Sequence, residues 1–177
     1  MKDKPIPESY WVIPTRFLAG EYPGLSFDLV GTRQRLAAFL AAGFDTFIDL
    51  TCEGERADYL RLLKGEAKAA GQPIQYQRLS FPDFKVPTHV RMTAALDAID
   101  SALADDHKVY LHCVGGIGRT GTTVGCWLVR HGMVPADALR QVGNLYHNAL
   151  QSNFMHRSPE TEEQAKFILN WTEDGLA

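Results

Sequence analysis

The chain has 177 residues and a formal net charge of −3 at pH 7, with 18 Lys and Arg against 21 Asp and Glu. Its length predicts a single domain over residues 1–177, and the charge balance argues against a protein held to nucleic acid or to an acidic membrane by bulk electrostatics. Three scattered cysteines argue against a disulfide framework and against a paired-cysteine zinc site.

Residues 1–10 are polar and rich in proline, and we expect them to form a flexible N-terminal arm. They lack the apolar core of a secretory signal or a membrane span. The low number of cysteines favours a reducing compartment. We therefore expect a soluble cytoplasmic protein, and a monomer.

Apolar runs and turn residues predict alternating strands and helices. In chain order these are strands at 11–13 and 17–19, a helix from Ser26 to Gly43, a strand at 46–51, a helix over 59–70 that ends at Gly71, a strand at 74–79, a helix from Thr88 to 103, a strand at 108–111 and a helix at 120–130. Gly132 and Pro135 separate this helix from another that carries the apolar residues between Leu139 and Ala149, and a last helix is expected at 158–171. Ser26, Thr88 and Ser158 are the expected helix caps, with Pro159 in the first position of the last helix. Leu29 is expected to face inward.

This order of apolar strands and helices predicts an α/β fold with a central, mostly parallel sheet and helices on both faces. In such sheets the ligand crevice lies beyond the carboxyl ends of the strands. The polar loop 52–56, the loop 81–87 and the loop that follows Leu111 should therefore share one edge of the sheet.

The most informative segment follows the strand at 108–111 and reads His112-Cys113-Val114-Gly115-Gly116-Ile117-Gly118-Arg119-Thr120-Gly121. Backbone N–H groups that converge from a tight turn at a helix N-terminus hold phosphate well, and the glycines allow such a turn. Arg119 can grip two phosphate oxygens with its planar guanidinium. Cys113 lies where the same N–H groups and the helix dipole stabilise a thiolate, and Thr120 can donate a hydrogen bond to the sulfur.

A thiolate in a phosphate-binding loop predicts attack on phosphorus and a phosphocysteine intermediate. The leaving oxygen then needs a proton. Asp83 is the candidate acid because it lies on the preceding loop at the same sheet edge, 30 residues upstream of Cys113. In the second step the same carboxylate would take a proton from water. The chemistry requires no metal and no cofactor.

The segment from His112 to Gly121 resembles the signature loop of the cysteine-based protein tyrosine phosphatase superfamily, and the short chain with its acid on a separate upstream loop resembles the dual-specificity branch. The loop is similar to that of the cyclin-dependent-kinase-associated and cell-division-cycle phosphatases. Residues 158–164 also resemble a glutamine-bearing segment of that subgroup.

The resemblance implies a dual-specificity phosphatase-like fold and a role for each matching residue. These roles are nucleophile for Cys113, phosphate binding for Arg119 and the loop amides of Val114, Gly115, Gly116, Ile117 and Gly118, leaving-group assistance for Thr120, acid catalysis for Asp83, tuning of the thiolate for His112, and positioning of the attacking water for Gln164. For Gln164, ordinary inward polar packing is the alternative.

The neutral loop residues bear on the substrate. Lipid-directed members of the superfamily carry lysines in the loop, whereas Val114 and Ile117 are neutral here, which favours a phosphorylated protein or peptide. The alternatives are a phosphatase of small-molecule or inositol phosphates, and an inactive phosphate-binding module. The glycines at 116–121 also fit a dinucleotide-binding pattern, but no strand ending in an acidic residue follows the next helix.

Cys52 follows a buried strand at the expected site edge, much as a second cysteine does in lipid phosphatases of the superfamily, where it traps the oxidised nucleophile as a disulfide. We therefore hypothesise a reversible Cys52–Cys113 bond as a redox brake, with a buried bystander as the alternative. For Glu53, Glu55 and Arg56, the sequence favours a solvated loop over a cleft lining.

Overall fold

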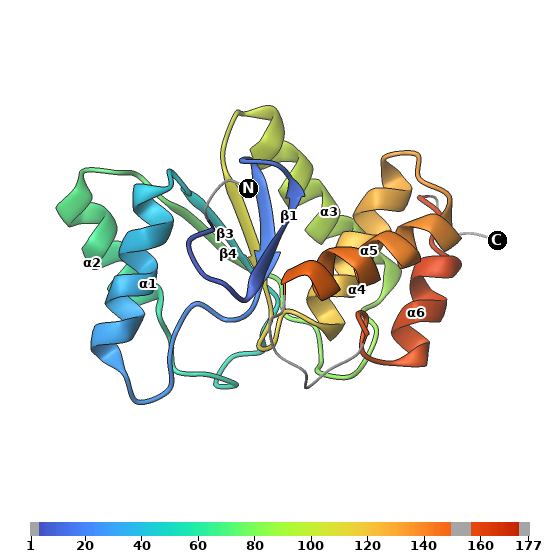
Figure 1. Cartoon of the computed structure of the whole chain (residues 1–177), viewed down its shortest axis with the longest axis horizontal. Coiled ribbons are helices and arrows are strands. Elements are labelled where there is room, and N and C mark those ends of the chain that lie inside the picture. Colours follow the sequence, from blue (N-terminus) through green and yellow to red (C-terminus); the bar gives the residue numbers. More distant parts are fainter. Residues whose placement is uncertain (1–3, 150–156, 174–177) are drawn as a thin grey trace.

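The computed structural model describes residues 4–149 and 157–173. Figure 1 shows a central sheet with helices on both of its faces. The elements are β1 (Ser9–Ile13), β2 (Phe17–Gly20), α1 (Leu29–Ala41), β3 (Thr46–Asp49), α2 (Leu60–Ala70), β4 (Gln75–Arg78), α3 (His89–Ala104), β5 (Val109–His112), α4 (Gly118–Arg130), α5 (Pro135–Ala149) and α6 (Glu162–Leu169). This architecture confirms the predicted fold class.

The sheet has the strand order β1-β2-β5-β3-β4. Only β1 pairs antiparallel with its neighbour, and the other pairs are parallel. Gly20 and Asp49 both pair with His112, so β2, β3 and β5 end at the same level. The loops that follow these strands therefore open on one edge, as the sequence predicts.

The sheet divides the apolar core in two because successive side chains of a strand point to opposite faces. In β5, Tyr110 packs with α1 and α2, while Val109 and Leu111 pack with the helices of the other face. Figure 1 shows α1 and α2 on one side of the sheet and α3 to α6 on the other. On the second face α4 is almost wholly buried, so the segment that begins it is held firmly.

Several predicted boundaries are confirmed and others are wrong. Gly71 ends α2 in the left-handed conformation and Thr88 caps α3, both as predicted. Helix α1, however, is capped by Asp28, whose carboxylate accepts the N–H of Gly31 at 2.8 Å, and not by Ser26. Leu29 consequently faces solvent.

At the chain ends, Thr161 and not Ser158 caps α6. The first three residues of the predicted arm lie outside the described residues. Its remaining part belongs to the fold, because Ile6 is buried in the core and Ser9 opens β1. The Ser9 hydroxyl also donates to the Ile6 carbonyl at 2.6 Å. The arm prediction is therefore wrong for these residues: the sequence pattern did not reveal that one isoleucine anchors the segment.

Candidate active site

The loop between β5 and α4 forms a tight turn around Gly116, whose φ is +70°. A Cβ atom on this residue would lie 2.4 Å from the carbonyl carbon of Gly20, so only glycine fits here. Gly115 and Gly118 do not share the positive φ expected of them. Of the three, Gly116 is therefore the residue whose backbone conformation requires glycine.

Helix α4 begins at Gly118 without a side-chain cap. Its N-terminus thus presents backbone N–H groups and the positive end of the helix dipole to the loop that starts at Cys113. The backbone of the loop is fixed from outside, since Tyr22 donates its N–H to the Val114 carbonyl at 2.9 Å and the Ser158 hydroxyl donates to the Ile117 carbonyl at 2.8 Å. This geometry suits a bound anion such as phosphate.

The imidazole of His112, the residue before Cys113, is fully buried. Its Nδ1 lies 3.2 Å from the Cys113 carbonyl oxygen and its Nε2 lies 2.7 Å from the hydroxyl of Tyr59. Because a carbonyl only accepts, Nδ1 carries the proton and Nε2 accepts from Tyr59. Burial lowers the pKa of His112 more than nearby Asp49 raises it, so the ring is neutral at pH 7.

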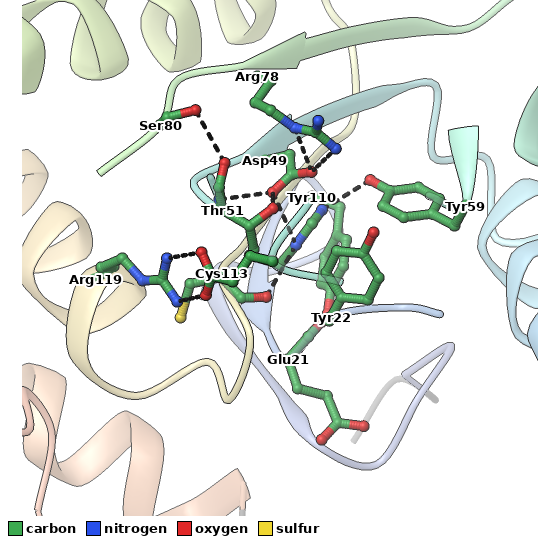
Figure 2. A network of polar contacts seen from close by, with 12 residues as sticks. Glu21, Tyr22, Asp49, Thr51, Tyr59, Arg78, Ser80, Tyr110, Cys113 and Arg119 are labelled. Atoms are coloured by element: carbon green, nitrogen blue, oxygen red, sulfur yellow. Dashed lines mark hydrogen bonds and ion pairs between the residues drawn. The ribbon is translucent and has the colours of Figure 1, made fainter. Parts of the chain in front are cut away.

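Asp49, at the end of β3, is the centre of a polar network that Figure 2 shows between Thr51 and Arg78. Its Oδ1 accepts the N–H and hydroxyl of Thr51 at 2.8 and 2.6 Å, and its Oδ2 accepts the Tyr76 hydroxyl at 2.7 Å. Burial opposes ionisation, but His112 and these hydrogen bonds outweigh it and lower the pKa of Asp49. The network fixes the start of the loop that leads to Glu55.

The guanidinium of Arg119 is buried and has three protein partners. Glu55 binds it through both carboxylate oxygens, at 2.6 Å from Nη2 and 2.8 Å from Nη1. The Phe81 carbonyl accepts from Nη1 at 3.2 Å, and Oδ1 of Asp83 lies 3.0 Å from Nη2. The bonds from Arg119 lower the pKa of Glu55. The expectation that Glu55 belongs to a solvated loop is therefore wrong.

Two buried polar atoms at this site have no hydrogen-bond partner among the described residues, namely Arg119 Nε and Thr120 Oγ1. Buried polar atoms are rarely left unpaired in a folded protein. The expected bond from Thr120 to the Cys113 sulfur is thus not formed, although Thr120 is fully buried one residue after Arg119. Both atoms are available to an anion or to a thiolate at the loop.

Asp83 reaches the site from the loop between β4 and α3, as the sequence predicts. The N–H of Phe84 donates to its Oδ1 at 3.1 Å, which orients the carboxylate that meets Arg119. Phe84 adopts a left-handed φ of +55° and is exposed. An acidic group and the phosphate loop therefore lie within one cluster.

Gln164 is fully buried, as its spacing on the last helix predicts. Its Oε1 accepts the N–H groups of Glu160 and Thr161 at 3.1 Å, and its Nε2 donates to the Lys85 carbonyl at 3.3 Å. Both ends of the carboxamide are thus occupied by backbone groups. Gln164 joins α6 to the loop that carries Asp83.

All three cysteines are free thiols in the structure. Cys52 is partly buried, and its sulfur lies 3.5 Å from the Phe81 carbonyl, the same group that Arg119 contacts. Cys126 is buried within α4, where desolvation raises its pKa. Cys52 therefore belongs to the same group of loops as Cys113, whereas Cys126 belongs to the core.

Within residues 4–149 and 157–173, no three His, Cys, Asp or Glu side chains are grouped so that they could hold a metal ion. Among the helices in these ranges, none combines the length and the apolar character needed to cross a bilayer.

Comparison with known proteins agrees with this geometry. The family model described as "Polymorphic toxin system, DSP-PTPase phosphatase" matches residues 30–133. A protein of Invertebrate iridescent virus 6 named as a tyrosine phosphatase is 30% identical over 142 residues, which cover 78% of this chain and 49% of the viral protein. Dual specificity protein phosphatase CDC14B of Mus musculus is 30% identical over 125 residues, covering 68% and 24%. The chain thus spans half or less of these relatives.

Solved structures share the fold. A kinase associated phosphatase with its catalytic cysteine replaced by serine has a TM-score of 0.72 at 15% identity, covering 91% of this chain and 90% of that one. PTPMT1 in complex with PI(5)P has a TM-score of 0.62 at 19% identity, covering 91% and 94%. The fold is therefore shared with a kinase associated phosphatase and with a protein that is described in complex with PI(5)P.

Proposed function

Because the chain belongs to the dual-specificity branch of the cysteine-based protein tyrosine phosphatases and is a phosphatase of that superfamily, we propose that it hydrolyses phosphate monoesters of protein side chains through a phosphocysteine at Cys113. The observation that carries the proposal is the loop itself: a buried cysteine precedes an uncapped helix N-terminus, with the guanidinium of Arg119 beside it.

In the first step, the Cys113 sulfur attacks phosphorus while the loop N–H groups and Arg119 hold the phosphate oxygens. The S–P bond forms and the bond to the leaving oxygen breaks. That oxygen takes a proton from Asp83, which contributes about 10²–10⁴ in rate when correctly placed. Because the Asp83 carboxylate already contacts Arg119 at 3.0 Å, it can reach a group held by that arginine.

In the second step, water attacks the phosphocysteine and the S–P bond returns its electron pair to sulfur. The orphaned hydroxyl of Thr120 supports a role at this stage, since it can donate a hydrogen bond to the departing thiolate. His112 acts indirectly: its Nδ1 proton binds the Cys113 carbonyl and so fixes the backbone of the nucleophile.

We propose a phosphorylated protein or peptide as the substrate class. Val114 and Ile117 are neutral, so the loop adds no cation besides Arg119 for a polyphosphorylated ring. Inositol phosphates are the rival class because PTPMT1, which has the same fold, is described in complex with PI(5)P.

The test is turnover of 4-nitrophenyl phosphate in the presence of a metal chelator. Wild-type protein should release nitrophenol and Cys113→Ser should not. Activity that is absent in the wild type, or unchanged in Cys113→Ser, contradicts the proposed chemistry. The same Cys113→Ser protein, offered phosphopeptides and inositol phosphates in parallel, should bind the peptides more tightly. Preference for inositol phosphates would contradict the proposed substrate class.

A further inference from the structure

The segment that precedes α6 is bound to the start of α4. Ser158 donates its hydroxyl to the Ile117 carbonyl, and a Cβ atom on Gly121 would lie 2.1 Å from that hydroxyl oxygen. Gln164 then fixes the next residues by accepting the N–H of Glu160. The backbone of Glu160 is therefore held at a defined position beside the phosphate loop.

The carboxylate of Glu160 faces that loop. A Cβ atom on Gly118 would lie 3.1 Å from Glu160 Oε2. Gly118 is the first residue of α4, so its N–H belongs to the group that would hold phosphate. No described residue forms a hydrogen bond or an ion pair with the Glu160 carboxylate, although the residue is half-buried. An acceptor thus faces the reaction site without a protein partner.

The surroundings raise the pKa of this carboxylate. Burial and the negative charge of Asp83 raise the pKa of Glu160, and Arg119 on α4 opposes them. Tyr146 on α5 also lies near Glu160. The pKa of its phenol is raised by burial and by the negative charge of Glu160. Arg157 donates to the Glu160 carbonyl and not to its carboxylate. A carboxylate with a raised pKa is a stronger base than an ordinary glutamate.

The two carboxylates at the site have different partners. Asp83 contacts Arg119 and the Phe84 N–H, whereas Glu160 has neither contact. A pair of acidic groups held in different environments can divide acid and base roles. Gln164, which the sequence suggests for positioning water, has both ends of its carboxamide bound to backbone. The same Cβ position on Gly118 lies 3.0 Å from both amide atoms of Gln164, so Gln164 and Glu160 both line this side of the loop. Of the two side chains, only the Glu160 carboxylate has no hydrogen-bond partner among the described residues.

We propose that Glu160 is a second catalytic carboxylate, which accepts the proton of the water that hydrolyses the phosphocysteine. The inference rests on the proposed function. Water oxygen bonds to phosphorus, the S–P bond breaks with its electron pair on the Cys113 sulfur, and one water proton moves to Glu160. The phosphate leaves with the other proton. Glu160 then passes its proton through solvent to Asp83, which gave one to the leaving group in the first step.

The experiment is rapid-mixing kinetics with 4-nitrophenyl phosphate, whose leaving group needs little protonation. Glu160→Gln should retain a burst of about one nitrophenolate per enzyme, and its steady-state rate should then fall by about 10²-fold or more. Phosphorylated Cys113 should accumulate and be found by mass spectrometry after an acid quench. Glu163→Gln is the matched control, since Glu163 is exposed on α6, and it should behave as the wild type.

An unchanged steady-state rate in Glu160→Gln would overturn the inference, as would a rate raised by the loss of charge repulsion. A slower burst without accumulated phosphocysteine would also overturn it, because the residue would then act on the first step or on the structure. The thermal unfolding temperature of Glu160→Gln, compared with that of the wild type, distinguishes a folding defect from a catalytic one. Failure of the proposed function is a different result: wild-type protein would give no burst, or Cys113→Ser would retain turnover.

Discussion

Glu55 binds both terminal nitrogens of Arg119, at 2.6 and 2.8 Å, and so sets the plane of the guanidinium before any phosphate arrives. The pair is largely shielded from water, with 1% of the Arg119 side chain and 22% of the Glu55 side chain exposed. An arginine held in this plane loses less side-chain entropy when it grips a phosphate.

We therefore predict that Glu55→Gln lowers kcat/KM for an aryl phosphate. A hydrogen bond to a charged group contributes about 1.5–3 kcal/mol, equivalent to roughly a 10- to 100-fold loss. Glu53→Gln is the control, because Glu53 lies two residues earlier on the same loop and is exposed. Equal kcat/KM values for the two variants would show that Glu55 does not orient Arg119 for catalysis.

The contact between Glu55 and Arg119 could not be predicted from the sequence. Cys113, Arg119 and Asp83 could be placed at one edge because parallel strands end together and each residue lies in or next to a loop that follows such a strand. Glu55 lies in an irregular loop whose path depends on the Asp49 network, and no periodicity reports that path. The only signal was an acidic residue beside a buried strand.

Gln164 illustrates a second limit. Helical spacing correctly predicts that it faces inward, yet spacing does not say which atoms it meets. The capping box formed with Thr161 decides that question, and the cap itself was misplaced at Ser158. With Thr161 as the cap, Gln164 is the third helical residue of a capping box, which accounts for its inward position.

Asp83→Ala should lower kcat by an amount that depends on how much protonation the leaving group needs. An alkyl phosphate such as phosphoserine peptide needs a proton on its departing oxygen, whereas nitrophenolate leaves without one. We expect a loss of about 10²–10⁴ in kcat for the alkyl ester and a much smaller loss for the nitrophenyl ester, with little change in binding. Similar, small losses for both esters would place the acid elsewhere.

Gly116→Ala should disable the phosphate loop. The added methyl would meet the backbone of Gly20 and Glu21 at 2.4–2.7 Å, and φ at this residue is positive. Gly115→Ala is a close control, because its methyl would contact only the Ile117 side chain at 3.4 and 3.5 Å. We expect Gly116→Ala to lose phosphate binding, measured by inhibition with vanadate, and Gly115→Ala to retain it. Vanadate inhibition of equal strength in both variants would contradict this account of the turn.

Buried His112 should make the fold less stable at acidic pH. Burial lowers its pKa in the folded state, whereas in the unfolded chain a histidine titrates near 6.5. Below that pH the unfolded state binds a proton that the folded state does not, so the free energy of unfolding falls, by at most about 1.4 kcal/mol per pH unit. Asp49, with its lowered pKa, stays ionised in this range.

Denaturant unfolding between pH 7 and 5 checks this expectation. His112→Asn should show a flatter decrease in stability than the wild type. His107 acts in the opposite direction: its bond to Asp45 raises its pKa, so its contribution is present at acidic pH and lost as pH rises. His107→Asn should therefore steepen the decrease. Parallel curves for the wild type and His112→Asn would show that His112 does not control acid stability.

Reversible inactivation by peroxide should depend on Cys52. Cys113 follows β5 and Cys52 follows the neighbouring strand β3, so oxidation of the Cys113 thiolate to a sulfenic acid would allow attack by the Cys52 thiol, with loss of water and formation of a disulfide. Wild-type protein should then recover activity with dithiothreitol, as should Cys126→Ser, whose changed residue lies within α4. Cys52→Ser should instead proceed to sulfinic Cys113 and recover less. Peptide mass spectrometry that finds only overoxidised Cys113 in the wild type, without a Cys52 linkage, would leave Cys52 as a bystander of the site.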